Sequence, residues 1–296
     1  MSMIISCRED YDLGERLAET LGVEHSIASR KTFPDGEIYV RVPDKLPSTV
    51  AIVQTLYPDQ NTRFLELLLA INAVKNQGVE RIIAIVPYLA YSRQDKVFLK
   101  GEPISVRVVL EMIHNAGADI LMTVEIHNSE SLSWFKGVAV NIRPFQHIAE
   151  HLKNMPSGET IVVAPDIGAI WRAKSLASVL GTEYDYLVKH RDRITGEISI
   201  EPKSINVRDK HVVIVDDIIS TGGTIAKASE ALKKLGAASI SVAAVHGLFV
   251  SNAIEKIKKA GVDRVIVTNT TTPPSNVEVV DITSLLATHL KQFITV

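Results

Sequence analysis

The sequence has a single cysteine, little net charge and no long hydrophobic run. Cys7 alone cannot form an internal disulfide, and it fits a reducing compartment. A formal net charge of −2 gives no general attraction to nucleic acid or to an anionic membrane surface. No apolar run is long enough to span a bilayer, and the first ten residues lack the apolar core of a signal peptide. We therefore expect a cytoplasmic protein without nucleic-acid or membrane partners.

Two common nucleotide-binding motifs are also missing. The sequence contains neither G-x-x-x-x-G-K-[ST] nor G-x-G-x-x-G, so a Walker A loop and a Rossmann fingerprint are both excluded. Because the protein as a whole is nearly neutral, any phosphate site must be built from local groups.

Apolar strands alternate with helical segments along the whole chain. At 296 residues, with 46% hydrophobic and 22% charged residues, the chain has the size and composition of two ordinary domains. Two pairs of segments, residues 82–93 with 161–172 and residues 117–127 with 236–246, suggest an internal repeat. We predict α/β architecture, with two similar doubly wound domains at residues 1–143 and 144–296. In the predicted helix from Arg63 to Asn76, we expect Leu65, Leu68, Leu69 and Asn72 to share a face.

Residues 211–224 carry the most informative pattern. Four apolar residues, typical of a strand buried on both faces, lead to Asp216 and Asp217, then to the small-residue loop 220–224, and then to a helix-favouring segment. Glycines, hydroxyls and the free N–H groups of a helix start can hold a phosphate, while carboxylates accept hydrogen bonds from a diol or hold a cation. The pattern suggests a ribose phosphate with Mg²⁺. The alternative is an ordinary strand end followed by a capped helix.

Other unusual clusters also follow predicted strands. Residues 88–95 follow one strand, His127 another and Asp166 a third. Ligands of open α/β sheets bind beyond the carboxyl ends of the strands, so the coincidence indicates that these clusters bind ligands. Considered alone, a histidine in the position of His127 is more often structural than a ligand. The charged clusters at residues 93–95 and 189–193 can also be explained as solvated surface segments. The Pro-Asp-Gly turn at 34–36 is an ordinary turn, but Phe33 and Glu37 beside it suit stacking on a base and hydrogen bonding to it.

Taken together, these segments resemble the ribose-phosphate diphosphokinase family, whose members make phosphoribosyl diphosphate from ATP and ribose 5-phosphate. The motifs occur in the family's order over nearly the whole chain, namely residues 33–37, 87–95, 124–127, 164–166, 189–191 and 216–224. The last of them resembles the phosphoribosyl-diphosphate loop of the type I phosphoribosyltransferase fold. The resemblance implies that fold for both domains, diphosphoryl transfer for nucleotide biosynthesis, Mg²⁺ as cofactor, and a homo-oligomer with a dimer as its minimal active unit.

The resemblance also assigns roles to individual residues. Phe33, Asp35 and Glu37 would meet the adenine, reaching it from a neighbouring subunit. The implied nucleotide contacts are Phe33, Asp35, Gly36, Glu37, Arg93, Gln94 and Asp95, and the implied metal ligands are His127 and Asp166. Lys189 and Arg191 match the catalytic loop, and ribose 5-phosphate would contact Arg191, Asp216, Asp217, Ser220, Thr221, Gly222, Gly223 and Thr224.

Three positions depart from the family pattern. Ser220 stands where many members carry an acidic residue, His190 where arginine is common, and Ala169 where glycine is usual. None of them removes a charge that the chemistry needs, so they bear on the detail of the sugar site. Two alternatives remain open: a phosphoribosyltransferase, which explains only the 216–224 loop, and a non-catalytic regulatory homologue.

Overall fold

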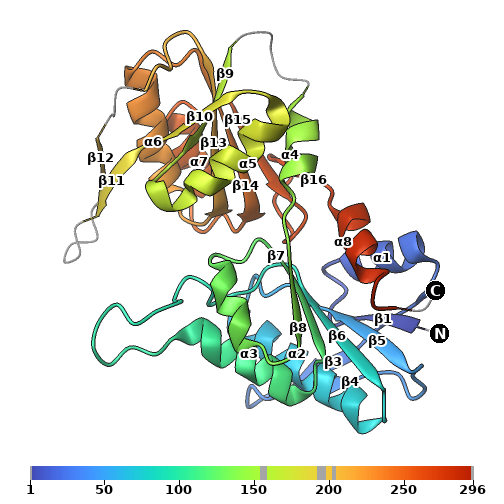
Figure 1. Cartoon of the computed structure of the whole chain (residues 1–296). Helices are drawn as coiled ribbons and strands as arrows, with labels where there is room; N and C mark the ends of the chain where they lie inside the picture. The colour runs from blue at the N-terminus through green and yellow to red at the C-terminus, as the bar shows by residue number, and fades with distance from the viewer. Residues whose placement is uncertain (1, 154–158, 192–197, 202–204, 295–296) are drawn as a thin grey trace. The chain divides into compact units, whose positions relative to one another are not determined.

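The computed structural model describes residues 2–153, 159–191, 198–201 and 205–294, and for residues 189–191 and 198–201 it describes the backbone alone. The chain forms two compact units (Figure 1). The first comprises Met1–Arg143 with Thr270–Thr272 and Ile282–Val296, and the second comprises Pro144–Asn269 with Pro273–Asp281.

A six-stranded sheet in the order β2-β1-β5-β6-β7-β8 forms the centre of the first unit, and all of its strand pairs are parallel. Its strands are β1 (Ser2–Ser6), β2 (Glu24–Ile27), β5 (Thr49–Val53), β6 (Arg81–Val86), β7 (Ile120–Val124) and β8 (Val138–Ile142). Its helices pack in pairs, α2 beside α3 and α1 beside α8. They are α1 (Leu13–Leu21), α2 (Gln60–Asn76), α3 (Ser105–Ala116) and α8 (Thr283–Leu290), with the 3₁₀ turn η1 (Ser129–Trp134).

The second unit repeats this arrangement. Its sheet has the order β10-β9-β13-β14-β15-β16, again wholly parallel. The strands are β9 (Thr160–Ala164), β10 (Glu183–Tyr186), β13 (His211–Ile219), β14 (Ser239–Gly247), β15 (Arg264–Thr268) and β16 (Glu278–Val280). Helix α4 packs beside α5, and α6 beside α7. These helices are α4 (Phe145–Leu152), α5 (Ile170–Leu180), α6 (Gly223–Lys234) and α7 (Ala253–Lys259), with the 3₁₀ turn η2 (Ile167–Ala169).

Each unit also carries a two-stranded antiparallel ribbon, inserted between its second and third sheet strands. In the first unit the ribbon is β3 (Ser29–Thr32) with β4 (Ile38–Arg41), and in the second it is β11 (Val188–Arg191) with β12 (Ile198–Glu201). The shared strand order and the shared place of the insertion confirm the prediction of two similar doubly wound domains.

The segments that suggested the repeat are not its equivalent parts. Residues 82–93 begin in β6, the fourth strand of the first sheet in chain order, whereas residues 161–172 begin in β9, the first strand of the second sheet. Residues 117–127 and 236–246 likewise span β7 and β14, which are the fifth and fourth strands of their sheets. A buried strand followed by a polar loop recurs at every strand of a parallel sheet, so similarity of this kind does not identify equivalent strands.

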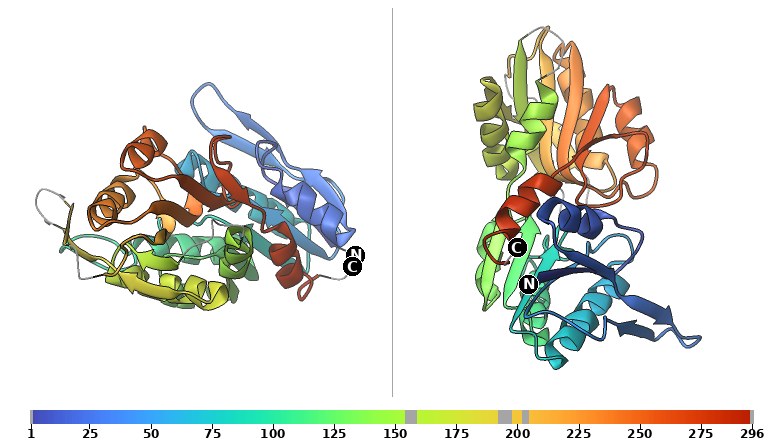
Figure 2. Two further views of the ribbon diagram at one scale, coloured as in Figure 1. Left: turned by 90° about the horizontal axis from the view of Figure 1, so that it is seen from above. Right: turned by 90° about the vertical axis from the view of Figure 1, so that its right-hand side faces the viewer.

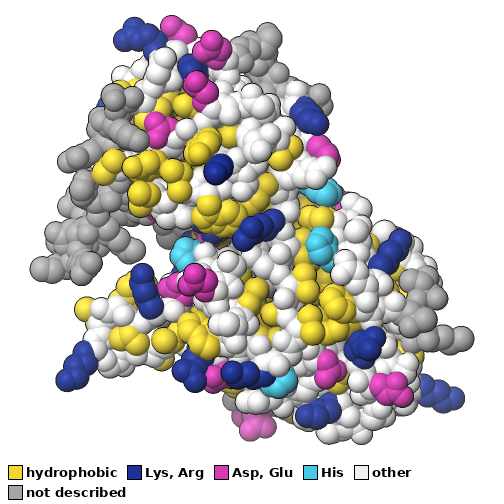
Figure 3. Space-filling view, in the orientation of Figure 1, with side chains coloured by type: hydrophobic (Ala, Val, Ile, Leu, Met, Phe, Trp, Pro, Cys, Tyr) yellow, Lys and Arg dark blue, Asp and Glu magenta, His cyan; other side chains and the backbone are white. Residues whose placement is uncertain are grey.

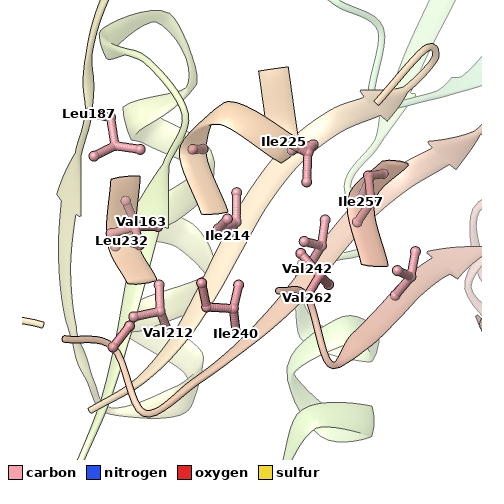
Figure 4. Close-up of a cluster of buried hydrophobic side chains, with 14 of the residues drawn as sticks. Val163, Leu187, Val212, Ile214, Ile225, Leu232, Ile240, Val242, Ile257 and Val262 are labelled. Carbon is pink, nitrogen blue, oxygen red and sulfur yellow. The ribbon is translucent and has the colours of Figure 1, made fainter. Parts of the chain in front are cut away.

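The core of the second unit explains why its strands are apolar along their whole length. Val212 and Ile214 of β13 pack with Ile225 of α6 and Ile257 of α7 (Figure 4). Because helices cover both faces of a parallel sheet, successive strand residues are all buried. Residues His211 to Val215 are buried in this way, and only at Asp216 does the strand become partly accessible.

Helix α2 differs from the prediction. Leu65 and Leu69, expected on a common packed face, are 47% and 37% exposed. The buried face instead carries two charged residues, Arg63 and Glu66. The apolar residues on the same face are Leu67, Ala70, Ile71 and Val74. The predicted face was therefore wrong, because two charged residues of this helix are buried in ion pairs.

On the face drawn in Figure 3, positive and negative side chains are interspersed over both units. This face therefore presents no large field of one sign. In the described part of the chain, no helix combines the length and the hydrophobicity needed to cross a bilayer.

Candidate active site

The carboxyl end of β13 presents Asp216 and Asp217 on opposite faces of the sheet. Side chains alternate along a strand, so Asp216 shares the face of Val212 and Ile214, which α6 covers, and Asp217 lies on the other face. Asp216 is half-buried, and its Oδ1 accepts a hydrogen bond of 2.9 Å from the backbone N–H of Asp217. Burial, and next the neighbouring charge of Asp217, raise the pKa of Asp216 well above its usual range.

Asp217 forms an ion pair in the interior. Its Oδ2 lies 3.5 Å from Nη2 of Arg172, and the two side chains are 6% and 3% exposed. Arg172 comes from α5, which packs on β13. The prediction grouped both aspartates at the sugar, but only Asp216 of the two lies at a partly accessible position.

The loop from Ser220 to Thr224 joins β13 to α6. Gly222 has φ of +71°, and a Cβ there would lie 3.0 Å from the Ala253 carbonyl oxygen and from the Ile257 side chain of α7. Gly222 is therefore required by backbone conformation and by packing. Gly223 differs, because the nearest atom to its Cβ would be Thr221 Oγ1 at 3.8 Å, so its surface is open to a ligand.

Helix α6 begins at Gly223 with backbone groups suited to an anion. The N–H groups of the first turn have no partner within a helix, and no described side chain caps this end. The hydroxyls of Ser220, Thr221 and Thr224 come from the same turn. Such an arrangement attracts phosphate through both hydrogen bonds and the helix dipole.

A lysine that was not predicted also contacts this loop. Nζ of Lys256, on α7, donates a 2.9 Å hydrogen bond to the carbonyl oxygen of Thr221. Lys256 lies far along the sequence in an ordinary lysine-rich helix, so no local pattern distinguished it.

Asp166 follows β9, the strand next to β13. It is half-buried and begins the turn η2, where its Oδ1 accepts a 3.3 Å hydrogen bond from the N–H of Ala169. Because β9 and β13 are adjacent and parallel, Asp166 and Asp216 emerge at the same edge of the sheet. The structure thus brings together Asp166, Asp216 and the 220–224 loop.

The predicted catalytic residues lie on the ribbon of the second unit. Lys189 and Arg191 belong to β11, where they pair with Ile200 and Ile198 of β12, and β12 contacts α6 (Figure 1). Their side chains lie outside the part that the structure describes. The backbone therefore places the ribbon beside α6, the helix that follows the 220–224 loop.

In the first unit, the loop after β6 carries Arg93, Gln94 and Asp95. Gln94 Oε1 accepts a hydrogen bond from the Ser105 hydroxyl, and Asp95 Oδ2 accepts one of 2.8 Å from Asn128 Nδ2. Arg93 is exposed. Gln94 and Asp95 thus shape the loop through their side chains, whereas the exposed Arg93 can meet an anion.

His127 follows β7, which is paired with β6. It is exposed and precedes Asn128, the residue that holds Asp95. The structure therefore joins the His127 segment to the 93–95 loop, as expected from their positions after adjacent strands. Within the described residues, no group of three or more His, Cys, Asp or Glu side chains is arranged to hold a metal ion.

The turn from Phe33 to Glu37 lies at the tip of the β3–β4 ribbon, which extends away from the rest of the first unit (Figure 2). Gly36 has φ of +95°, the Phe33 N–H donates to the Glu37 carbonyl at 2.7 Å, and Asp35 Oδ1 accepts from the Glu37 N–H at 3.1 Å. Phe33 is 37% exposed, and Lys31 Nζ lies 4.8 Å from its ring centroid. The ring is available for stacking, whereas the other predicted nucleotide contacts of the first unit, Arg93, Gln94 and Asp95, lie on the loop after β6.

Comparison with known proteins matches both units. Residues 2–117 match the N-terminal domain of ribose phosphate pyrophosphokinase, and residues 144–286 match the phosphoribosyl transferase domain. A ribose-phosphate pyrophosphokinase of Sulfurisphaera tokodaii is 43% identical over 96% of this chain and 99% of its own. One of Pyrococcus furiosus is 47% identical over 84% of this chain and 88% of its own.

A solved structure is also similar throughout. The crystal structure of phosphoribosylpyrophosphate synthetase from Mycobacterium smegmatis has a TM-score of 0.89 and 29% sequence identity, and the match covers 98% of this chain and 97% of that one. Both the sequence and the fold of the complete two-unit chain are thus matched, and this protein belongs to the ribose-phosphate pyrophosphokinase family.

Proposed function

We propose that the protein transfers the β,γ-diphosphoryl group of ATP to the 1-hydroxyl of ribose 5-phosphate. The bond formed joins the ribose 1-oxygen to the β-phosphorus, and the bond broken joins that phosphorus to the oxygen bridging it to the α-phosphorus. The products are phosphoribosyl diphosphate and AMP, and the hydroxyl proton passes to solvent.

The observation that supports this most is the edge of the second sheet. A partly accessible carboxylate at Asp216, an open glycine at Gly223 and the uncapped start of α6 follow one another within eight residues of chain. These groups can bind a ribose 5-phosphate: the carboxylate accepts hydrogen bonds from its hydroxyls, and the backbone N–H groups donate hydrogen bonds to its phosphate. The family relationship then selects diphosphoryl transfer among the reactions such a loop serves.

Positioning and charge stabilisation account for most of the catalysis in phosphoryl transfer. Asp216 accepts hydrogen bonds from the ribose hydroxyls, and the 220–224 loop holds the 5-phosphate. Lys189 and Arg191 stabilise the negative charge that develops toward the leaving α-phosphate. Arg93 holds the nucleotide phosphates, supported by Gln94 and Asp95.

The residues present fit a Mg²⁺ ion that is bound largely through substrate. Mg²⁺ takes one or two carboxylates and completes its shell with phosphate oxygens and water, and Asp166 supplies one partly accessible carboxylate. His127 is the second proposed ligand on the basis of family resemblance, since a nitrogen ligand is uncommon for Mg²⁺. When bound, the ion would neutralise charge on the diphosphate.

The adenine site requires a second copy of the chain. We propose that Phe33, Asp35, Gly36 and Glu37 reach the nucleotide of a neighbouring subunit, with a dimer as the minimal active unit. The protruding ribbon and its exposed Phe33 ring support this role. A buried single cysteine supports the proposed cytoplasmic location.

Product analysis tests the proposal. The protein is incubated with ATP, ribose 5-phosphate and Mg²⁺, with Lys189→Ala as the matched variant. We expect AMP and phosphoribosyl diphosphate in equal amounts, with turnover lowered about 10²–10³-fold in the variant and little change in KM. ADP as product, or equal rates in both proteins, would contradict the proposal. No product at all would favour a non-catalytic homologue.

A further inference from the structure

The Arg172–Asp217 pair lies directly behind the proposed sugar site but does not face it. Arg172 is 3% exposed and approaches β13 from α5, whereas the 220–224 loop leads into α6. Arg172 is therefore too deeply buried to touch a substrate. A buried arginine is costly to desolvate, so its presence here calls for a role.

Arg172 is held firmly in place. Its guanidinium carbon lies 4.8 Å from the ring centroid of Trp171, and that ring packs edge to face on Phe145 of α4 at 5.7 Å. The contact with Asp217 places the guanidinium on the side of α5 that faces β13, and the Trp171 ring packs against it there. The helix itself begins only four residues after Asp166.

Two short links connect Arg172 to Asp216. The guanidinium Nη2 lies 3.5 Å from Asp217 Oδ2, and the Asp217 N–H donates a 2.9 Å hydrogen bond to Asp216 Oδ1. Fixing the Asp217 side chain fixes the peptide whose N–H orients the Asp216 carboxylate. The Arg172 guanidinium also acts on Asp216 itself: burial and the charge of Asp217 raise the pKa of that carboxyl, and Arg172 opposes these larger effects by lowering it.

We propose that Arg172 is a positioning residue that holds Asp217, and through it the Asp216 carboxylate, in the orientation required by the ribose hydroxyls. This inference rests on the proposed role of Asp216. It also explains why adjacent aspartates are needed: one contacts the sugar, and the other anchors the strand end to α5.

Three variants separate positioning from folding. Arg172→Met leaves a buried carboxylate without this partner, Arg172→Lys retains the charge, and the double variant Arg172→Met/Asp217→Asn leaves no charge at either position. KM for ribose 5-phosphate, KM for ATP, kcat and the melting temperature are measured for each. Arg264→Met is the matched control, because Arg264 pairs with Glu278 in the same unit at the amino end of β15.

We expect Arg172→Met to raise KM for ribose 5-phosphate about tenfold, the usual effect of losing a hydrogen-bonded charge, with KM for ATP changed less than about twofold. Arg172→Lys should recover much of the loss. The double variant should regain thermal stability and keep the raised KM. Arg264→Met should lower stability and leave both KM values unchanged.

Recovery of the wild-type KM in the double variant would overturn the inference, because Arg172 would then only neutralise Asp217. Equal changes in both KM values would overturn it as well. If Asp216→Asn leaves KM for ribose 5-phosphate unaltered, the proposed role of Asp216 fails instead, whatever the Arg172 variants show.

Discussion

Asp216 and Asp217 are neighbours in the sequence but lie in different surroundings. The Asp-Asp motif predicted a sugar site, and its place at the carboxyl end of a buried strand was predictable from the apolar run before it. Strand alternation allows only one of two successive side chains to face the loop. Which one does so depends on α5 and α6, and the partner Arg172 lies 45 residues before Asp217 (217 − 172). A single sequence contains no local signal for such a contact.

Replacement of Asp216 tests the residue that we assign to the sugar. Its pKa is raised, so the ionised form that accepts hydrogen bonds is favoured as pH rises through that pKa, and kcat/KM for ribose 5-phosphate should rise with it. Asp216→Asn should raise KM for ribose 5-phosphate about tenfold and KM for ATP much less.

The stability of the fold should change with pH in the opposite direction to kcat/KM. A carboxyl whose pKa is raised on folding contributes stability at pH values below its pKa in the unfolded chain. That contribution is lost as the pH rises through its pKa in the folded protein. At neutral pH, Asp216→Asn should therefore melt no lower than the wild type. Equal KM changes for both substrates, or a lower melting temperature, would show that Asp216 serves the fold.

At the scale of elements, the strands predicted before residues 88–95, His127 and Asp166 are present as β6, β7 and β9, whereas the buried face of α2 was not predicted. The helix α2 was predicted from its leucines, but its buried face includes Glu66, which Arg8 contacts through two hydrogen bonds of 2.7 and 2.9 Å. Arg63 lies on the same face, with Nη2 2.6 Å from Asp10. Periodicity counts apolar residues, so it misses a face that is partly buried through ion pairs.

Gly222 and Gly223 make a matched pair in the phosphate loop. Gly222→Ala places a Cβ at positive φ and 3.0 Å from α7, so it should lower the free energy of unfolding by about 1–3 kcal/mol. Gly223→Ala meets nothing closer than 3.8 Å and should fold normally, yet raise KM for ribose 5-phosphate. Denaturant unfolding and KM measurements check both. Equal stability of the two variants would contradict the roles we assign.

Glu278 joins three elements of the second unit. Arg264 donates to it at 2.8 and 2.6 Å and His151 Nε2 lies 2.9 Å from it, which lowers its pKa to about 2. A carboxyl whose pKa is lowered on folding stabilises the fold at pH values above its pKa in the unfolded chain. This stabilisation is lost as the pH falls toward 2.

Glu278→Gln should lower the free energy of unfolding by about 1 kcal/mol at neutral pH, because the side chain is partly exposed and screened. The difference should vanish near pH 2 in urea titrations, as far as the fold persists. Asp44→Asn, which removes an exposed pair with Arg41, is the control and should change little. A pH-independent difference would show that shape, rather than charge, accounts for the Glu278 effect.

For the whole molecule, the predicted fold class and family are confirmed by the shared sheet topology and by relatives covering nearly the full chain. The family's motifs sit at strand ends, so order along the chain was sufficient to recognise them. The path of the chain was not predicted from the sequence: α8 follows the second sheet but packs on α1 of the first unit. Such a return depends on long-range packing that a local pattern does not encode.

Subunit mixing tests the proposed shared site. Phe33→Ala and Lys189→Ala should each be nearly inactive, because each lacks one half of the site. After subunit exchange, a symmetric dimer with two shared sites should recover about one quarter of wild-type activity. Tyr39→Ala, on the same ribbon and 46% exposed, is the control and should remain active alone. No recovery after confirmed exchange would place both halves of the site in one chain.

The transfer of an intact diphosphoryl group is the central claim, and labelled ATP measures it directly. The protein is incubated with ribose 5-phosphate, Mg²⁺ and ATP carrying ³²P at the β-position or at the γ-position. We predict that both labels appear in phosphoribosyl diphosphate in equal yield and that AMP carries neither. Retention of the β-label in ADP, or its release as free diphosphate, would contradict the account.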